Sequence, residues 1–183
     1  ESNVRMADVV LINKVDTATP ENVRAVRENV VRLNPRAAVI EAASPIRVEN
    51  GERIRGKRVL VVEDGPTLTH GEMRYGAGVV AARQYGAAEI VDPRAFTSGK
   101  IRKTYEAYPN IGPVLPAVGY GEEQVRDLEA TIDAVDAEMV LIATPVDLRR
   151  IISINKDMLK VDYELQELGR PDLAECIRDR LDL

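Results

Sequence analysis

Short apolar runs alternate with amphipathic stretches along the 183 residues of this chain. Val9–Ile12 is a continuous apolar run, which favours a strand buried on both faces. After it, Thr19, Pro20 and Glu21 combine a helix N-cap, a proline at the first helical position and an acid in the first turn. Apolar residues then recur at spacings of three and four, which predicts a helix with one apolar face. These residues are Val23, Val26, Val30 and Leu33.

The same alternation continues to the end of the chain. Further strands are predicted at residues 38–40, 58–62, 89–91, 113–118, 139–143 and 158–165, and further helices at 76–85, around 125–135, at 147–154 and from 171 onward. Residues 45–57 read as a turn or linker, and residues 93–113 as irregular. We therefore expect a Rossmann-like α/β fold related to the P-loop NTPases, with a mostly parallel sheet and helices on both faces.

The polar stretch before residue 58 suggests two domains. Residues 1–56 are expected to be the C-terminal part of a nucleotide-binding, P-loop-like domain. Residues 57–183 are expected to be an α/β domain with a glycine-rich phosphate-site loop. Because the first apolar run begins so soon after Glu1, we also expect further sequence upstream, in the same polypeptide or as a separate chain.

Composition narrows the class of protein. Hydrophobic residues make up 45% and charged residues 30%, which is typical of a globular protein. The net charge of -5 argues against a nucleic-acid partner, because binding to a phosphate backbone needs a basic face. Cys176 is the single cysteine, which excludes an internal disulfide and a cysteine metal site. With no apolar run of about 20 residues, we expect a cytoplasmic protein with no membrane partner and no metal ligands of its own.

Asn13, Lys14, Val15 and Asp16 directly follow the first predicted strand. Guanine-binding NTPases place Asn-Lys-x-Asp in this context. The aspartate can accept hydrogen bonds from guanine N1–H and the exocyclic amine together, while the lysine stem lies along the base. We predict base binding by Asn13, Lys14 and Asp16; the alternative is a polar turn that opens the following helix.

The phosphate-binding half of such a site is not found in the chain. No Gly-x4-Gly-Lys-Ser/Thr motif occurs, and residues 97–100 lack the earlier glycine and the preceding strand. The strand at 58–62 ends in acids, as a magnesium-binding strand does, but it comes after Asn-Lys-x-Asp rather than before it. We therefore expect the phosphate loop upstream.

Residues 63–78 form a glycine-rich loop between a strand and a helix, where open α/β sheets place their ligands. Its glycines would let backbone N–H groups approach an anion at the helix start. We predict a phosphate or acid site here; the alternative is a flexible loop whose glycines only permit turns. The predicted catalytic residues are Asp64, His70 and Arg74, and the predicted ligand-binding residues are Thr69, Gly71, Gly76 and Gly78.

A second candidate follows the strand at 139–143. Arg149 and Arg150 stand at the start of a predicted helix, where two guanidinium groups could hold a phosphate or carboxylate. A capped surface helix explains them equally well. Four basic residues elsewhere read as solvated surface or as a lid over an anionic ligand. They are Arg94, Lys100, Arg102 and Lys103.

Asn-Lys-x-Asp, the segment 63–78 and Thr-Pro-x-Asp-Leu at 144–148 together resemble the cyclic 2,3-diphosphoglycerate synthetases and the related predicted GTPases, over about residues 7–168. The resemblance implies an upstream P-loop segment or chain and an ATP- or GTP-dependent reaction. In the synthetase, that reaction closes a phosphoanhydride within 2,3-diphosphoglycerate. Asp64, Thr69, His70 and Arg74 would then handle phosphate, with Mg²⁺ bridging the nucleotide oxygens.

We accordingly interpret the chain as the downstream portion of a ligase-, kinase- or GTPase-like enzyme, inactive in isolation. Two alternatives stay open. One is a non-catalytic module that binds a nucleotide or a small phosphorylated metabolite. The other is a structural partner of a separately encoded P-loop protein. Nothing in the sequence fixes the oligomeric state, and a homo-oligomer also stays open.

Overall fold

The computed structural model of the protein describes residues 1–71 and 73–181. The chain divides into two compact units. Unit 1 joins Glu1–Pro45 to Tyr163–Leu183, and unit 2 is Ile46–Asp162. The sequence led us to expect a boundary near residue 56 and a second domain that continues to the C-terminus. The contacts divide the chain earlier, after Pro45, and return the last residues to unit 1.

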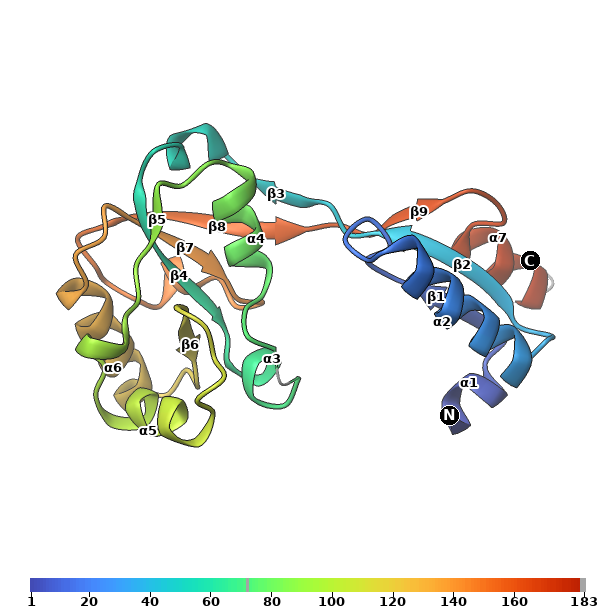
Figure 1. Cartoon of the computed structure of the whole chain (residues 1–183), viewed down its shortest axis with the longest axis horizontal. Helices are drawn as coiled ribbons and strands as arrows, with labels where there is room; N and C mark the ends of the chain where they lie inside the picture. Colours follow the sequence, from blue (N-terminus) through green and yellow to red (C-terminus); the bar gives the residue numbers. More distant parts are fainter. Residues whose placement is uncertain (72, 182–183) are drawn as a thin grey trace. The chain divides into compact units, whose positions relative to one another are not determined.

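Unit 1 is built on a three-stranded sheet in the order β1-β2-β9 (Figure 1). β1 (Val9–Ile12) runs parallel to β2 (Ala38–Ala43), and β9 (Gln166–Leu168) runs antiparallel to β2. The helices are α1 (Ser2–Met6), α2 (Pro20–Leu33) and α7 (Leu173–Leu181). α2 lies alongside β1 and forms the crossover that a parallel strand pair requires.

α2 begins and ends where the sequence predicts. Thr19 Oγ1 accepts a hydrogen bond from the backbone N–H of Asn22 at 3.3 Å, and Asn34 caps the other end. The sequence predicted that β1 would be buried on both faces and that Val26 would lie on a buried helix face, and this prediction is wrong in part. Val26 is 47% exposed, and only Ile12 of β1 is buried. The reason is that β1 is an edge strand with one strand neighbour, so that it is not enclosed as a central strand would be.

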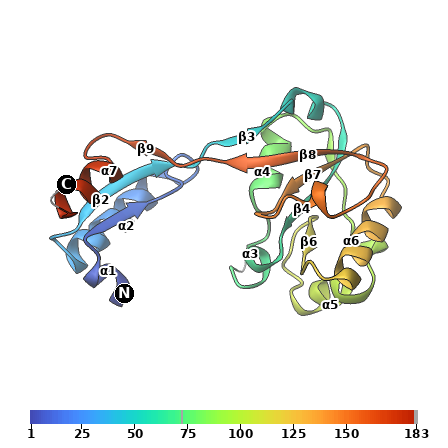
Figure 2. The same cartoon turned by 180° about the vertical axis from the view of Figure 1, so that it is seen from behind.

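Unit 2 contains a six-stranded sheet in the order β3-β8-β7-β4-β5, with β6 also paired to β4 (Figure 2). The strands are β3 (Ile46–Val48), β4 (Arg58–Asp64), β5 (Glu89–Ile90), β6 (Leu115–Ala117), β7 (Met139–Ala143) and β8 (Asp157–Tyr163). β4 is parallel to β5, β6 and β7, and β7 is parallel to β8. The predicted α/β class with mostly parallel strands is therefore confirmed.

The hydrophobic core of unit 2 surrounds β4 and β7. Residues 59–62 and 139–142 are all buried, as expected for central strands with apolar side chains on both faces. α4 (Ala77–Gln84) packs against both strands, and α5 (Gly99–Ala107) packs against α6 (Glu122–Ala134). Gly86 follows α4 with φ of 77°, a left-handed conformation in which helices commonly end at a glycine.

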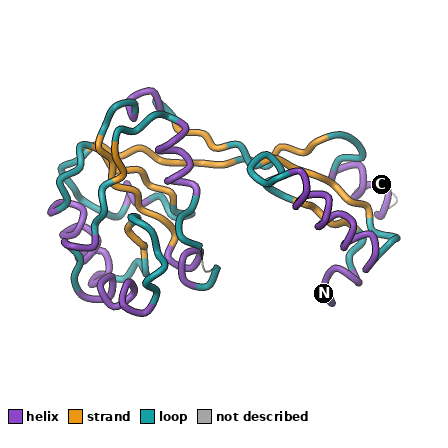
Figure 3. Tube along the Cα trace, viewed as in Figure 1, coloured by secondary structure: helices purple, strands orange, loops and turns teal. Residues whose placement is uncertain are grey.

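Several stretches that read as irregular contain regular structure (Figure 3). The predicted linker holds β3 and the 3-10 helix η1 (Gly51–Ile54), and the predicted irregular region holds η2 (Arg94–Phe96) and α5. α3 (Gly65–Thr69) directly follows β4. These elements are short or mostly polar: α5 buries only Ile101 and Tyr105, too few to produce a clear helical period. The helix expected at 147–154 is reduced to η3 (Leu148–Arg150).

Among the described residues, no helix is both long enough and apolar enough to cross a membrane.

Leu141→Ala tests the central role of β7. Leu141 is fully buried, so its truncation removes apolar contacts and leaves a cavity. We expect a loss of about 2–5 kcal/mol in the free energy of unfolding, measured by urea denaturation. Leu165→Ala is the control: Leu165 is 49% exposed, and its truncation should change stability by about 0.5 kcal/mol or less. Equal effects of the two variants would contradict this assignment of the core.

Candidate functional site

The loops that follow β4, β6 and β7 begin side by side at the carboxyl edge of the unit 2 sheet. Glu63 lies opposite Ala143 of β7, and Asp64 lies opposite Ala117 of β6. From β4 the chain continues to β5 and β6 on one side, while β7 pairs with β4 on the other. Open α/β sheets bind ligands at the point where strand order reverses in this way. The carboxyl edge of the sheet around the ends of β4, β6 and β7 is therefore the candidate site of unit 2.

Glu63 is the carboxylate at the centre of this edge, and it is only 2% exposed. Its Oε1 accepts hydrogen bonds from the backbone N–H groups of Gly76 at 3.0 Å, Gly78 at 3.0 Å and Val79 at 3.2 Å. Burial raises the pKa of Glu63 from 4.5 to about 7, although the three N–H groups favour the ionised form. The start of α4 is thus held by a side chain from β4.

This contact explains two of the glycines that we assigned to a phosphate site. A Cβ on Gly78 would lie 2.5 Å from Val61 Cγ1, and a Cβ on Gly76 would lie 2.5 Å from Glu63 Oε2. Both glycines permit the close approach of α4 to β4. Their N–H groups do meet a negative group at the helix start, as the sequence suggested, but that group is a carboxylate of the chain itself. A role for these two glycines with a bound phosphate stays a prediction.

Asp64 starts the loop and forms the N-cap of α3. Its Oδ2 accepts hydrogen bonds from Thr67 N at 3.2 Å and Thr67 Oγ1 at 2.8 Å. Tyr120, in the loop after β6, is close enough for the charge of Asp64 to add to partial burial in raising the pKa of the phenol. Sequence reasoning missed Tyr120, and the only signal was its position between two glycines after a strand. Asp64 and Tyr120 thus place an acid and a phenol in two loops that begin at this edge of the sheet.

His70 and Arg74 lie in the exposed loop between α3 and α4. The backbone N–H of His70 donates to Pro66 O at 2.8 Å, which ends α3, and the carbonyl oxygen of Arg74 accepts from Gly112 N at 2.7 Å. The backbone anchors both residues, and their side chains lie at the surface. Glu72, between them, lies outside the described residues.

Thr69 and Gly71 belong to the same turn. Thr69 Oγ1 donates to Gly65 O at 3.0 Å, so its hydroxyl is engaged within α3. A Cβ on Gly71 would lie 2.5 Å from Thr67 O, which makes this glycine a requirement of the turn. The ligand-binding roles predicted for His70, Arg74, Thr69 and Gly71 stay predictions.

Arg149 and Arg150 do not form a joint fork. Arg149 binds Asp147 through two hydrogen bonds, Nε to Oδ1 and Nη2 to Oδ2, each 2.8 Å long. The Arg149 guanidinium lowers the pKa of Asp147 to about 2. Arg150 is the outer residue, with its side chain 85% exposed. Arg150 Nε also lies 3.9 Å from Asp147 Oδ2, so the local contacts are those of a capped surface turn. A ligand-binding role for the two arginines stays a prediction.

The basic stretch after β5 is used mainly within the fold. Arg94 Nη2 donates to Ile111 O at 3.1 Å, and Arg102 Nε donates to Thr97 O at 3.0 Å. Lys100 Nζ lies 2.8 Å from the side-chain oxygen of Gln124 when that amide is oriented to satisfy both groups. These contacts hold η2, α5 and α6 in place.

In unit 1, residues 13–16 directly follow β1 and form hydrogen bonds to the end of β2. Asn13 Oδ1 accepts from Lys14 N at 2.8 Å, and Lys14 adopts the left-handed region with φ of 62°. Val15 N donates to Ala42 O at 3.1 Å. Asp16 Oδ1 accepts from the backbone N–H of Ser44 at 2.9 Å. Asp16 is exposed, so its carboxylate combines a fixed position with access to a ligand.

Ser44 is a residue that sequence reasoning missed, since nothing in its neighbourhood marks it as the partner of a residue 28 positions earlier. Among the residues that the structure describes, no three His, Cys, Asp or Glu side chains gather into a group that could hold a metal ion.

No model of a known protein family matches the chain. The chain is 55% identical, over 179 residues, to "Arginine synthetase ArcE" of Thermococcus kodakarensis. It is homologous to a portion of that enzyme. The alignment covers 98% of this chain and 40% of the relative, so the chain spans less than half the length of the curated protein that it matches.

This similarity overturns the expected relationship to cyclic 2,3-diphosphoglycerate synthetase and the function drawn from it, because the relative is an enzyme of arginine synthesis. The structure supplies a physical reason for the error. In the motifs that carried the resemblance, Asp64 caps α3, Asp147 caps η3, and Gly76 and Gly78 allow Glu63 to cap α4. Such residues specify turns and helix starts, which do not identify an acceptor substrate.

Glu63→Gln tests the buried carboxylate. Because the pKa of Glu63 is higher in the folded than in the unfolded chain, the folded protein binds more protons between pH 4.5 and 7. The stability that this protonation contributes is fully present below pH 4.5 and is lost as the pH rises through 7. Over that window the wild type should lose roughly 3 kcal/mol relative to Glu63→Gln, whose amide oxygen can still accept the same hydrogen bonds.

The measurement is urea denaturation of both proteins from pH 4 to pH 8. Parallel stability curves for the two proteins would contradict the raised pKa.

Proposed function

We propose that this chain is one part of a nucleotide-dependent synthetase, and that the product of the whole synthetase is arginine. The observation that carries the proposal is the 55% identity to an arginine synthetase over almost the whole chain. A synthetase of this kind drives an unfavourable bond formation by breaking a nucleoside triphosphate, which makes a ligase-type reaction the natural class. The nucleotide would be ATP or GTP, and Mg²⁺ would supply charge neutralisation of its phosphates.

The carboxyl edge of the unit 2 sheet is the proposed place for the amino-acid substrate. Arginine and its precursors carry an α-carboxylate and an α-ammonium group. Asp64 supplies an acceptor for a cationic group, and His70 and Arg74 supply donors from the neighbouring loop. Tyr120, in the loop after β6, adds a phenol that can orient the substrate. These four residues are the proposed substrate-binding set.

The loop 13–16 of unit 1 is the proposed place for the nucleotide base. Asp16 fits this role because Ser44 fixes one carboxylate oxygen and the side chain is exposed. The chain has no phosphate-binding loop motif of its own, so we assign the triphosphate to a P-loop segment or chain equivalent to the unmatched part of the relative. A reaction that consumes a nucleoside triphosphate also favours the cytoplasm as its location.

A chimera tests the function directly. In the Thermococcus enzyme, the portion that matches this chain is replaced by residues 1–183 of the protein. At 55% identity the replacement should fold in its new context, and we expect arginine formation coupled to nucleotide consumption, measured by chromatography of both products.

The same chimera with Asp64→Asn should fold but lose at least tenfold in rate, because the amide still accepts from Thr67 while the charge is gone. A folded chimera that forms no arginine would refute the proposal.

Asp16→Asn tests whether the chain recognises the base of GTP or that of ATP. The asparagine oxygen can keep the bond to Ser44 N, while an amide N–H₂ group replaces the remaining acceptor. If the base is guanine, the chimera should bind GTP at least tenfold more weakly and ATP equally well, measured by calorimetric titration. Asp8→Asn, on an exposed residue at the opposite end of β1, is the control. An equal loss for GTP and ATP would remove the role of Asp16 in base recognition.

A further inference from the structure

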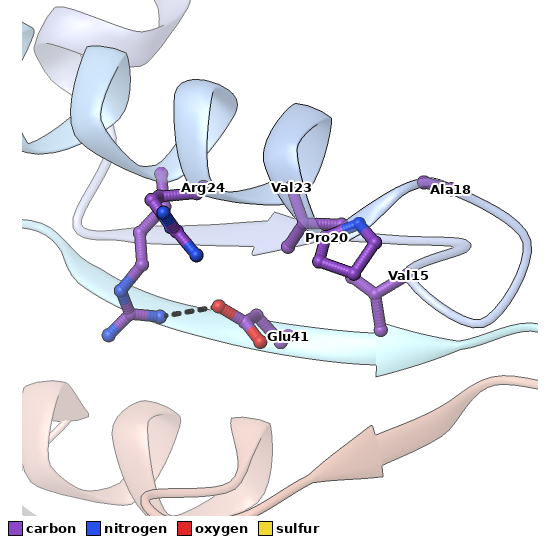
Figure 4. Close-up of a pocket in the computed structure, with 7 residues that line it drawn as sticks. Val15, Ala18, Pro20, Val23, Arg24 and Glu41 are labelled. Atoms are coloured by element: carbon purple, nitrogen blue, oxygen red, sulfur yellow. Dashed lines mark hydrogen bonds and ion pairs between the residues drawn. The ribbon is translucent and has the colours of Figure 1, made fainter.

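Unit 1 contains a pocket of about 440 Å³ between the first turns of α2 and strand β2 (Figure 4). We call it the α2–β2 pocket. Val15, Pro20 and Val23 form its apolar side, and Arg24, Arg27 and Glu41 form its charged side. Its volume lies within the range of small-molecule sites in proteins. Val15 belongs to the loop 13–16, next to the proposed base-binding side chains, and the other lining residues lie outside that loop and outside unit 2.

The charged side presents both signs to the same space. Arg27 Nη1 lies 2.9 Å from Glu41 Oε1, and these side chains are 49% and 31% exposed. Arg24 lies three residues before Arg27, so the two guanidinium groups are neighbours on the helix surface. Among the described residues, Arg24 has no hydrogen bond and no ion pair. The pocket therefore combines one balanced pair with one guanidinium that has no partner.

This combination selects a class of ligand. A simple anion such as phosphate would meet two guanidinium groups but also the carboxylate of Glu41, which repels it. A simple cation would be attracted by Glu41 but repelled by the two guanidinium groups. A ligand that carries a carboxylate and a cationic group at different positions satisfies both signs, and a chain of methylenes between them can lie on Val15 and Val23.

We infer that the α2–β2 pocket binds a free basic α-amino acid of the arginine type. Its carboxylate is held by Arg24, and its cationic end lies toward Glu41 beside the existing pair with Arg27. The choice of arginine rests on the proposed function, but the site is defined by unit 1 alone. It is a binding site separate from the one proposed for the substrate in unit 2.

The test is calorimetric titration of the 183-residue chain with L-arginine, followed by NMR titration that monitors the methyl groups of Val15 and Val23. We expect saturable binding and shifts of these methyl resonances. Agmatine, which keeps the guanidinium and lacks the carboxylate, should bind at least tenfold more weakly, since it cannot use Arg24. Inorganic phosphate should not compete.

Two variants make the assignment specific. Arg24→Gln should weaken arginine binding at least tenfold, because it removes the unpaired guanidinium. Arg32→Gln is the matched control on the same helix: Arg32 binds Asn29 at 2.8 Å, does not line the pocket and should leave the affinity unchanged. Circular dichroism spectra that match the wild type will verify that both variants are folded.

The inference is overturned if arginine does not bind, if agmatine or phosphate binds equally well, or if the two variants behave alike. These outcomes are distinct from failure of the proposed function, which is read from arginine formation by the chimera. An active chimera without binding in the α2–β2 pocket would leave the function standing and remove this site.

Discussion

The side chain of Glu63 turns inward at the end of β4 and meets the N–H groups at the start of α4. A helix start carries unpaired donors and a partial positive charge, and here a buried carboxylate satisfies three of them at 3.0–3.2 Å. The contact fixes α4 against the central strands, and it requires glycine at positions 76 and 78. The starts of α3 and α4 are therefore both fixed by acids at the end of β4, Asp64 and Glu63. The candidate site of unit 2 depends on these two contacts.

The same contact shows why a motif typical of ligand binding can be present without binding a ligand. An acid followed by a glycine-rich helix start is typical of an anion site, and the local geometry is indeed one that binds an anion. Here the anion is the Glu63 side chain of the protein itself, so the motif specifies the packing of α4 against β4. A similar contact within the chain occurs after β7. There Arg149, one of the two arginines that suggested a ligand site, pairs with Asp147 and closes a turn. What these motifs specify is the scaffold, which proteins with different substrates can share.

Local signals predicted the elements well where they were strong. Thr19 and Pro20 marked the start of α2, and the apolar residues of β4 and β7 marked the centre of a parallel sheet. α5 was missed because two buried side chains do not produce a period. The edge position of β1, the bond from Ser44 to Asp16 and the approach of Tyr120 to Asp64 depend on pairing between distant segments, which no local pattern records. The proposed substrate class rests on similarity to a relative, since helix caps and turns do not encode it.

The two units also differ in how binding should affect their stability. The contiguous hydrophobic core of the described residues lies within unit 2, whereas the buried apolar side chains of unit 1 are few and include small ones such as Ala42 and Ala43. A ligand that binds only the folded state adds about 2.7 kcal/mol of stability at a concentration one hundred times its dissociation constant. The same increment is a larger share of the stability of a unit with a small core. Since residues 13–16 and the α2–β2 pocket both lie in unit 1, occupancy of either site would stabilise the unit that carries the other.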